Sequence, residues 1–285
     1  MMHRLALVFV ALAALASAAP APAAPARTLD VKAFAEGHSG PAAGTVTLTG
    51  KGAGSERKIG GYDAYVAAPP GGAKPAAAVL LVTDVFGWKA DNARVWADQL
   101  AKKGFLVVMP DYFKGGARTK ADAPATFKTW LAKFPRERIL SETDAVLADV
   151  RKQYPSVKKL GVQGFCWGGL YAVLLTHKPA RVAAAVVYHG SLLTPADIEA
   201  IAAPISFQQA DPTLDSQIKT EFFAAIRASL ARKAAAGGLD ASATAFAGMP
   251  HGFAMRANAS DPATTAAATT AFNAGAAFLA KHLLA

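Results

Sequence analysis

From residue 76 onward, short apolar runs alternate with stretches of helical periodicity, and this alternation strongly limits the folds open to the chain. The continuous apolar run at residues 76–82 predicts a strand buried on both faces. Further strands are predicted at residues 105–109, 160–165, 182–188, 205–209 and 242–247. Helices are predicted at residues 91–103, 139–150, 168–177, 218–230 and from Pro262 onward. Such an order is typical of an α/β protein with a mainly parallel sheet and helices on both faces.

The sheet is expected to start with antiparallel strands. Residues 45–49 alternate polar and apolar side chains, residues 62–67 form a second short strand, and glycines between them indicate a turn. Residues 111–135 are rich in Lys, Gly and Pro and predict an irregular segment.

The N-terminus is typical of an export signal. Arg4 precedes an apolar run from Leu5 to Ala16, and Ala16-Ser17-Ala18 provides small residues for cleavage. A membrane anchor would need about 20 apolar residues, more than this run contains. We therefore expect a cleaved signal at residues 1–18 and a leader at 19–44, followed by the α/β domain at 45–285. The predicted location is periplasmic or secreted, without a stable membrane anchor.

The net charge is +10, but lysines and arginines are scattered along the chain. A basic surface can attract anionic substrates, or it can simply keep a protein soluble. No dense Lys/Arg run with interleaved aromatic residues occurs, so the sequence does not predict nucleic-acid binding.

The only cysteine, Cys166, lies where a predicted strand meets a predicted helix. Residues 164–169 read Gly-x-Cys-x-Gly-Gly, the pattern of a nucleophile elbow with Cys in place of Ser. Glycines around the sharp turn remove side chains that would collide, and the helix N-terminus favours a thiolate. A lone cysteine can also be an inert buried residue. Its place on this turn favours a nucleophile.

The partners of Cys166 are predicted from chain order. Parallel α/β sheets collect catalytic groups at the carboxyl ends of strands, and there only His189 and His251 are available among the histidines. His251 follows the last strand, as required of the base, which leaves His189 a structural or pocket role. Asp211 directly follows strand 205–209 and is the predicted orienting acid. Asp215 is the alternative, although it also suits a helix N-cap.

Backbone N–H groups of Trp167 and Val85 are the predicted oxyanion donors, because they follow the nucleophile and the strand at 76–82. Asp84, next to Val85, is then expected at the mouth of the site.

Four motifs together resemble the dienelactone hydrolase (carboxymethylenebutenolidase-like) family: Cys166 in its elbow, residues 84–87 (Asp-Val-Phe-Gly), residues 110–113 (Pro-Asp-Tyr-Phe) and residues 251–253 (His-Gly-Phe). The resemblance spans about residues 60–284. It implies an α/β-hydrolase fold and a Cys–Asp–His triad, which map onto Cys166, Asp211 and His251. It also implies that an acid, here Asp84, holds the resting thiol and helps to deprotonate it.

Two features depart from the family pattern. Family members hold a substrate carboxylate with arginines, whereas Lys114 and Gly115 stand where one would be sought, and Arg256 lies near the position of the other. An export signal is the second departure, because lactone-degrading members generally work in the cytoplasm.

The sequence thus predicts hydrolysis of enol lactones or other activated esters, anionic ones included, through a thioester intermediate. The alternatives are a general periplasmic esterase or thioesterase with the same triad, and a non-catalytic binding protein on a decayed hydrolase fold. The sequence has no His-Glu-x-x-His motif, cysteine cluster, phosphate loop or dinucleotide fingerprint, so it predicts neither metal nor cofactor.

Overall fold

A computed structural model describes residues 49–285 of the chain. The predicted signal at 1–18, the leader at 19–44 and nearly all of the predicted strand at 45–49 lie outside the described residues. Within them the strands are β1 (Ser55–Ile59), β2 (Tyr62–Ala67), β3 (Ala77–Val82), β4 (Leu106–Pro110), β5 (Lys159–Phe165), β6 (Ala184–Tyr188), β7 (Ile205–Ala210) and β8 (Ala241–Phe246). The α-helices are α2 (Asp91–Ala101), α3 (Phe127–Leu131), α4 (Arg136–Gln153), α5 (Trp167–Thr176), α6 (Pro195–Glu199), α7 (Thr220–Gly237) and α8 (Pro262–Leu283).

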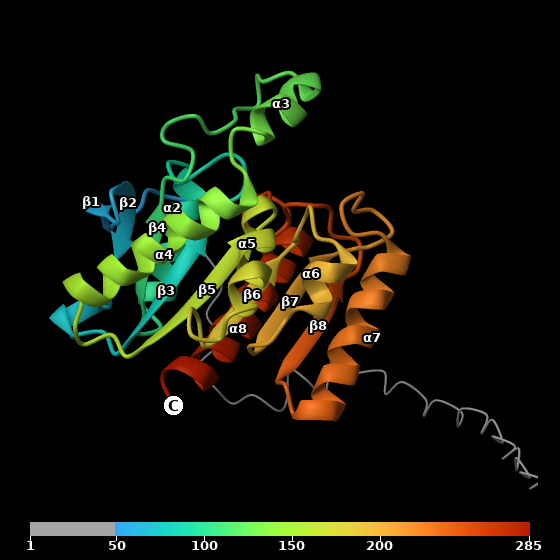
Figure 1. The fold of residues 1–285 in the computed structure, drawn as a ribbon. Helices are drawn as coiled ribbons and strands as arrows, with labels where there is room; N and C mark the ends of the chain where they lie inside the picture. The colour runs from blue at the N-terminus through green and yellow to red at the C-terminus, as the bar shows by residue number, and fades with distance from the viewer. Residues whose placement is uncertain (1–48) are drawn as a thin grey trace, which may run out of the picture. The chain divides into compact units, whose positions relative to one another are not determined.

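The strands form one sheet in the order β1-β2-β4-β3-β5-β6-β7-β8. From β4 to β8 all neighbours are parallel, whereas β2 is antiparallel to both β1 and β4. The predicted fold class, a mainly parallel sheet with antiparallel N-terminal strands, is confirmed. Figure 1 shows this sheet between its helices.

The first antiparallel strand is β1, which the sequence pattern did not predict. Its first four residues are polar and exposed, as suits an edge strand, and only Ile59 is apolar and buried. Gly60 and Gly61 join it to β2 with φ angles of 58° and 84°. Positive φ at both turn positions matches the right-handed twist of a hairpin, and glycine adopts it without steric cost.

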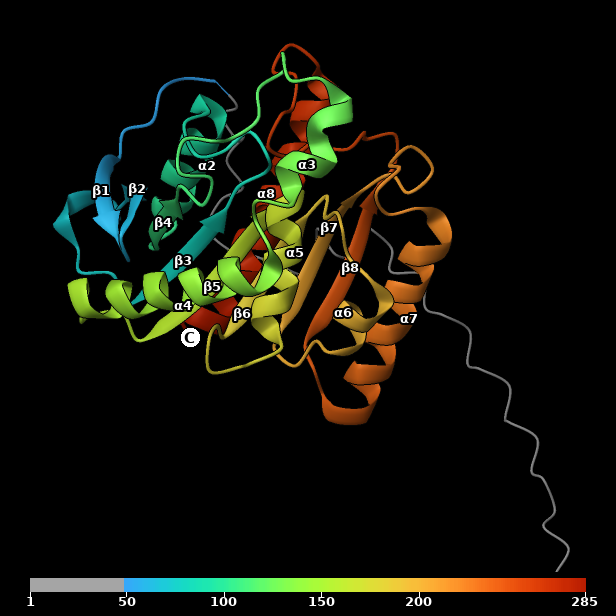
Figure 2. The ribbon, with the colours of Figure 1, turned by 45° about the horizontal axis from the view of Figure 1, so that its top comes forward.

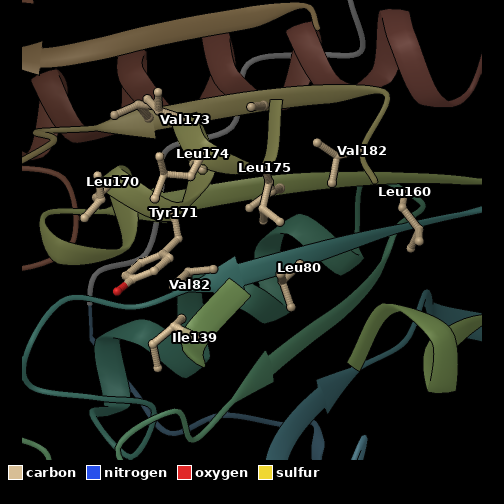
Figure 3. Packing of buried hydrophobic residues seen from close by; sticks show 14 of the residues in the cluster. Leu80, Val82, Ile139, Leu160, Leu170, Tyr171, Val173, Leu174, Leu175 and Val182 are labelled. Carbon is tan, nitrogen blue, oxygen red and sulfur yellow. The ribbon is translucent and has the colours of Figure 1, made fainter. Parts of the chain in front are cut away.

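Alternate residues of the strands divide the core between the two faces of the sheet. Leu80 and Val82 of β3 belong to the core under α4, α5, α6 and α7, whereas Val79 and Leu81 face α2 and α8. Figure 3 shows part of the first core, where side chains of α5 meet Ile139 and Leu80. Every residue of α5 is buried. The sheet is therefore covered on both faces, as the apolar runs predict.

The segment predicted to be irregular, residues 111–135, contains a single turn of 3-10 helix and α3. Phe113 packs against Trp130, Phe134 and Trp167, with ring centroids 4.7–5.1 Å apart. In Figure 2 α3 stands at the end of the sheet where α5 begins, which is also the carboxyl end of the parallel strands. No helix of the described residues is long and apolar enough to cross a membrane.

Candidate active site

Cys166 is the single residue between β5 and α5, with φ 51° and ψ −113°. Glycine is required on both sides of this turn. A Cβ on Gly164 would lie 2.1 Å from the carbonyl oxygen of Gly168, and one on Gly168 would lie 2.1 Å from that of Val82. The strained turn holds a partly exposed thiol at the N-terminus of α5, where the helix dipole favours a negative charge.

The turn after β6 is joined to Cys166 by its backbone. The Cys166 N–H donates to the Tyr188 carbonyl, and the Ser191 N–H donates to the Cys166 carbonyl, each over 3.1 Å. The Ser191 hydroxyl oxygen lies 3.6 Å from the Cys166 sulfur, and either atom can donate. No sequence motif pointed to Ser191. Its only signal is its position three residues after a central strand.

His251 follows β8, and its Nδ1 lies 2.9 Å from Oδ2 of Asp215. The side chain of Asp215 is fully buried. The same Oδ2 accepts a hydrogen bond from Gln209, and Oδ1 accepts one from the Gln217 N–H. Asp215 is thereby held in one orientation against the imidazole, whose other nitrogen, Nε2, is buried without a well-formed hydrogen bond among the described residues.

The charge state of His251 reflects these neighbours. Burial lowers its pKa, but the hydrogen bond to Asp215 and the proximity of the Cys166 sulfur raise it, and the net result is a pKa of about 9. A raised histidine pKa favours an imidazolium next to a thiolate over a neutral imidazole next to a thiol.

The prediction that Asp211 is the partner of His251 is wrong, because Asp215 occupies that place. Asp211 instead ties two loops together. Its Oδ2 accepts the Gly248 N–H over 2.7 Å, and its Oδ1 accepts the Thr213 N–H and hydroxyl. These hydrogen bonds lower the pKa of Asp211, the bond from Gly248 contributing most. The loop bends around Asp211, and this bend lets the Asp215 carboxylate reach His251.

Asp84 and Arg256 form an ion pair between residues 172 positions apart. Asp84 is almost fully buried and also accepts the Phe86 N–H, while the Arg256 guanidinium lies over the Phe86 ring. The expectation that Asp84 holds the resting thiol is therefore not met, since the hydrogen-bonding neighbour of the sulfur is Ser191. Arg256 is paired with the Asp84 carboxylate, and its role in binding a substrate carboxylate stays a prediction.

Trp167 and Val85 lie where the chain order places them. Trp167 is the first residue of α5, so its N–H has no carbonyl partner within the helix. The Val85 carbonyl accepts the Arg118 N–H over 2.8 Å, which fixes the loop after β3 against residues 113–118. Their role as oxyanion donors stays a prediction.

His189 is completely buried beside His251, with ring centroids 5.1 Å apart. Neither of its ring nitrogens has a hydrogen-bond partner within residues 49–285. Burial, and secondly the positive charges of His251 and Arg256, hold its pKa well below the usual value. His189 is thus a neutral neighbour of the base.

Lys114, the other residue considered for a substrate carboxylate, lies over the Tyr62 ring and pairs with Glu142. It has two partners of its own and does not join the cluster around Cys166. In the described part of the chain no group of His, Cys, Asp or Glu side chains is arranged to hold a metal ion.

An elbow between a parallel strand and a helix, with a histidine and a buried carboxylate on the following loops, defines an α/β-hydrolase. A family model described as the dienelactone hydrolase family matches residues 62–283. The chain therefore belongs to the dienelactone hydrolase family, and it is a hydrolase of that family.

Curated relatives agree with this assignment. A carboxymethylenebutenolidase homolog of Mus musculus is 30% identical over 206 residues, which cover 72% of this chain and 81% of the mouse protein. A homolog of Xenopus tropicalis is 36% identical over 138 residues, 48% of this chain and 55% of that protein.

Two solved structures show the same fold. A putative dienelactone hydrolase from Klebsiella pneumoniae has a TM-score of 0.64 at 24% identity, over 76% of this chain and 92% of that one. A dienelactone hydrolase-like promiscuous phosphotriesterase from metagenomic libraries has a TM-score of 0.65 at 21% identity, over 81% and 99%. At these identities the likeness concerns the fold alone.

Proposed function

We propose that the protein is a carboxylic ester hydrolase that cleaves enol lactones or other activated esters through Cys166. One observation carries the proposal: His251 is bonded through Nδ1 to buried Asp215, while Cys166 contributes to the raised pKa of the same imidazole. A nucleophile, a base and an orienting acid in this order are the parts of a covalent hydrolase.

The reaction begins when the Cys166 proton passes to Nε2 of His251 and the thiolate attacks the ester carbonyl carbon. The carbonyl oxygen becomes negative, and the N–H groups of Trp167 and Val85 stabilise it. The imidazolium returns its proton to the leaving oxygen as the C–O bond breaks, which leaves a thioester. His251 then deprotonates a water that attacks the thioester, and the acid and the thiol are released.

A sulfur nucleophile restricts the substrate. A thiolate leaves a tetrahedral intermediate more readily than an alkoxide does, so an adduct with an ordinary alkyl ester mostly returns to starting material. An enolate or phenolate is a better leaving group and lets the reaction go forward. The chemistry therefore favours enol lactones and activated esters.

Arg256 favours an anionic substrate. Its guanidinium is partly exposed and pairs with Asp84, so a carboxylate on the substrate can compete for it. Binding would exchange one charge-assisted hydrogen bond for another and would free Asp84 near the loop of Val85.

The first experiment compares wild type with Cys166→Ser and Cys166→Ala on p-nitrophenyl acetate and on cis- and trans-dienelactone. We expect both variants to lose nearly all activity, and acid-quenched wild type to carry an acyl group by intact mass. A Cys166→Ser enzyme as fast as wild type would contradict the role of sulfur. Preference for short p-nitrophenyl esters or thioesters over both dienelactones would favour the general esterase or thioesterase.

We further propose export to the periplasm or outside the cell, which rests on the signal-like residues 1–18 and the leader at 19–44. The test is expression of the full chain in a bacterium, followed by fractionation and N-terminal sequencing. Mature protein in the periplasm or medium, beginning near residue 19, is expected. Uncleaved protein in the cytoplasm would contradict the proposal.

A further inference from the structure

We propose that Ser191 is the residue that holds the Cys166 thiol at rest and stabilises the thiolate that replaces it. The inference rests on the proposed function, because it concerns the same nucleophile. It assigns to the turn after β6 a role that the sequence motifs assigned to Asp84.

The Ser191 hydroxyl is buried in contact with the Cys166 sulfur. Ser191 is 3% exposed, and its hydroxyl oxygen lies 3.6 Å from the sulfur, within the range of hydrogen bonds to sulfur. A buried hydroxyl needs a hydrogen-bond partner, and the thiol provides one. Backbone hydrogen bonds from the Cys166 N–H to Tyr188 and from the Ser191 N–H to Cys166 hold the two turns next to each other.

The backbone is strained at this turn. Four residues other than glycine have positive φ in the described chain, namely Lys114, Cys166, His189 and Leu192. Three of the four are the nucleophile and the residues around Ser191. Such conformations cost free energy and persist where the surrounding structure requires them. The strain is thus concentrated where Ser191 meets Cys166.

Close packing of the two turns supports the same conclusion. A Cβ on Gly169, in the first turn of α5, would lie 2.8 Å from the Cα of Gly190. Glycine at position 169 therefore lets the turn after β6 approach the start of the helix, and this approach brings the Ser191 hydroxyl to the sulfur.

Asp84 is bonded to other groups and not to the sulfur. Its two carboxylate oxygens bind Arg256 and the Phe86 N–H. A carboxylate beside the sulfur would also raise the thiol pKa, because like charges disfavour ionisation. A neutral hydroxyl has no such effect.

A hydroxyl can form a hydrogen bond with the sulfur both as a thiol and as a thiolate. It accepts a hydrogen bond from the thiol, and after the proton has passed to His251 it rotates and donates to the thiolate. Ser191 keeps its own proton throughout, so no net transfer to it occurs. The consequence is a thiolate that forms in the free enzyme, without substrate.

The test uses alkylation by iodoacetamide, which reacts with the thiolate and needs no turnover. Since the whole sequence has a single cysteine, all labelling reports on Cys166. We expect wild type to react in the absence of substrate, and the midpoint is the pH at which its labelling rate is half of the maximum. In Ser191→Ala the midpoint rises by about one pH unit, which corresponds to roughly tenfold slower labelling at lower pH. Ser191→Thr, which keeps the hydroxyl, restores most of the rate.

Ser229→Ala is the matched control, because Ser229 is another buried serine, on helix α7. A Ser191→Ala profile that superimposes on that of Ser229→Ala, with native circular dichroism, would overturn the inference. If Ser191→Ala does not fold, the S–H infrared band of wild type decides, measured at low pH against Cys166→Ala. A band at the lower frequency of a hydrogen-bonded thiol supports the inference, and one at the frequency of a free thiol overturns it.

Hydrolysis of p-nitrophenyl acetate separates this inference from the proposed function. A shifted alkylation profile in a protein that hydrolyses no ester would support Ser191 and contradict the function. Ester turnover with an unshifted alkylation profile would support the proposed function and contradict the role of Ser191.

Discussion

Asp215 and His251, 36 positions apart in the sequence, meet with Oδ2 2.9 Å from Nδ1, although Asp211 comes first in the same loop. Asp215 is fully buried and Asp211 is not, so the two carboxylates differ in how strongly each can stabilise an imidazolium. A buried carboxylate interacts more strongly because less water screens its charge. Substituting each aspartate separately therefore shows which of the two orients His251.

Asp215→Asn is expected to lower kcat/KM on p-nitrophenyl acetate by about a thousandfold or more, because the amide no longer fixes the correct tautomer of His251. Asp211→Asn is the matched control, since Asp211 bonds only to the loops. Its loss is expected to stay within about tenfold. A larger loss in Asp211→Asn than in Asp215→Asn would restore Asp211 as the acid.

The pH–rate profile is expected to fall on the alkaline side near pH 9. There the His251 imidazolium loses the proton that the leaving group needs, consistent with its pKa of about 9. Asp215→Asn removes one hydrogen bond and one negative charge that raise this pKa, so the alkaline limb should move to lower pH. The measurement is kcat/KM of the residual activity between pH 6 and 10. An alkaline limb that does not move would show that Asp215 does not set the pKa of His251.

Conformational stability is expected to fall as the pH drops below about 6.5, the ordinary histidine pKa. His189 has its pKa lowered in the fold, so the native state binds fewer protons than the unfolded state in this range, at up to about 1.4 kcal/mol per pH unit. His251 adds no slope there, because its raised pKa leaves it charged in both states. Urea unfolding between pH 5 and 6 measures the slope, below the range in which His251 would contribute a slope of opposite sign.

His189→Asn is the variant for this test, because asparagine tolerates the positive φ of 36° at this position. We expect a flatter pH dependence, whatever the absolute stability of the variant. An unchanged slope would mean that another group takes up the proton.

Arg256→Gln is expected to raise KM for carboxylate-bearing dienelactones by about tenfold while changing KM for neutral p-nitrophenyl acetate little. Lys114→Gln is the control, because its ammonium is paired with Glu142 away from Cys166. Equal effects of Arg256→Gln on both substrates would argue against a carboxylate site and for a structural role of the Asp84 ion pair.

Gly168→Ala is expected to destabilise the protein by about 3 kcal/mol, because its Cβ would overlap the carbonyl of Val82 at 2.1 Å. Gly237→Ala is the control on an exposed helix end, where a Cβ meets nothing within 4 Å. It should be neutral or stabilising by up to about 1 kcal/mol. Thermal or urea unfolding of both variants provides the comparison. Equal stabilities would show that glycine is not required at position 168.

The central parallel strands β3, β4 and β6 could be predicted because they are buried on both faces and consist of apolar runs. β1 could not, since an exposed edge strand such as Ser55–Ile59 has no apolar run. The short helices α3 and α6 lack the length that a helical period needs to become visible.

At the site, Cys166 was predictable because local glycines mark the elbow, and His251 because chain order fixes its loop. The choice between Asp211 and Asp215 could not be predicted. It depends on a hydrogen bond between Asp211 and the Gly248 N–H, two residues 37 positions apart. The Asp84–Arg256 pair and the Ser191 contact join distant segments in the same way and leave no mark in a local motif.

The packing of α5 has a consequence for the local dynamics of the site. Every residue of this helix is buried, so the amides that are hydrogen-bonded within it, beyond its first turn, should exchange with solvent only when the whole domain unfolds. Asp215 and His251 lie on loops, which open at lower free energy. Mild denaturant should therefore separate the base and the acid from a still rigid sulfur, and esterase activity should disappear before the sheet melts.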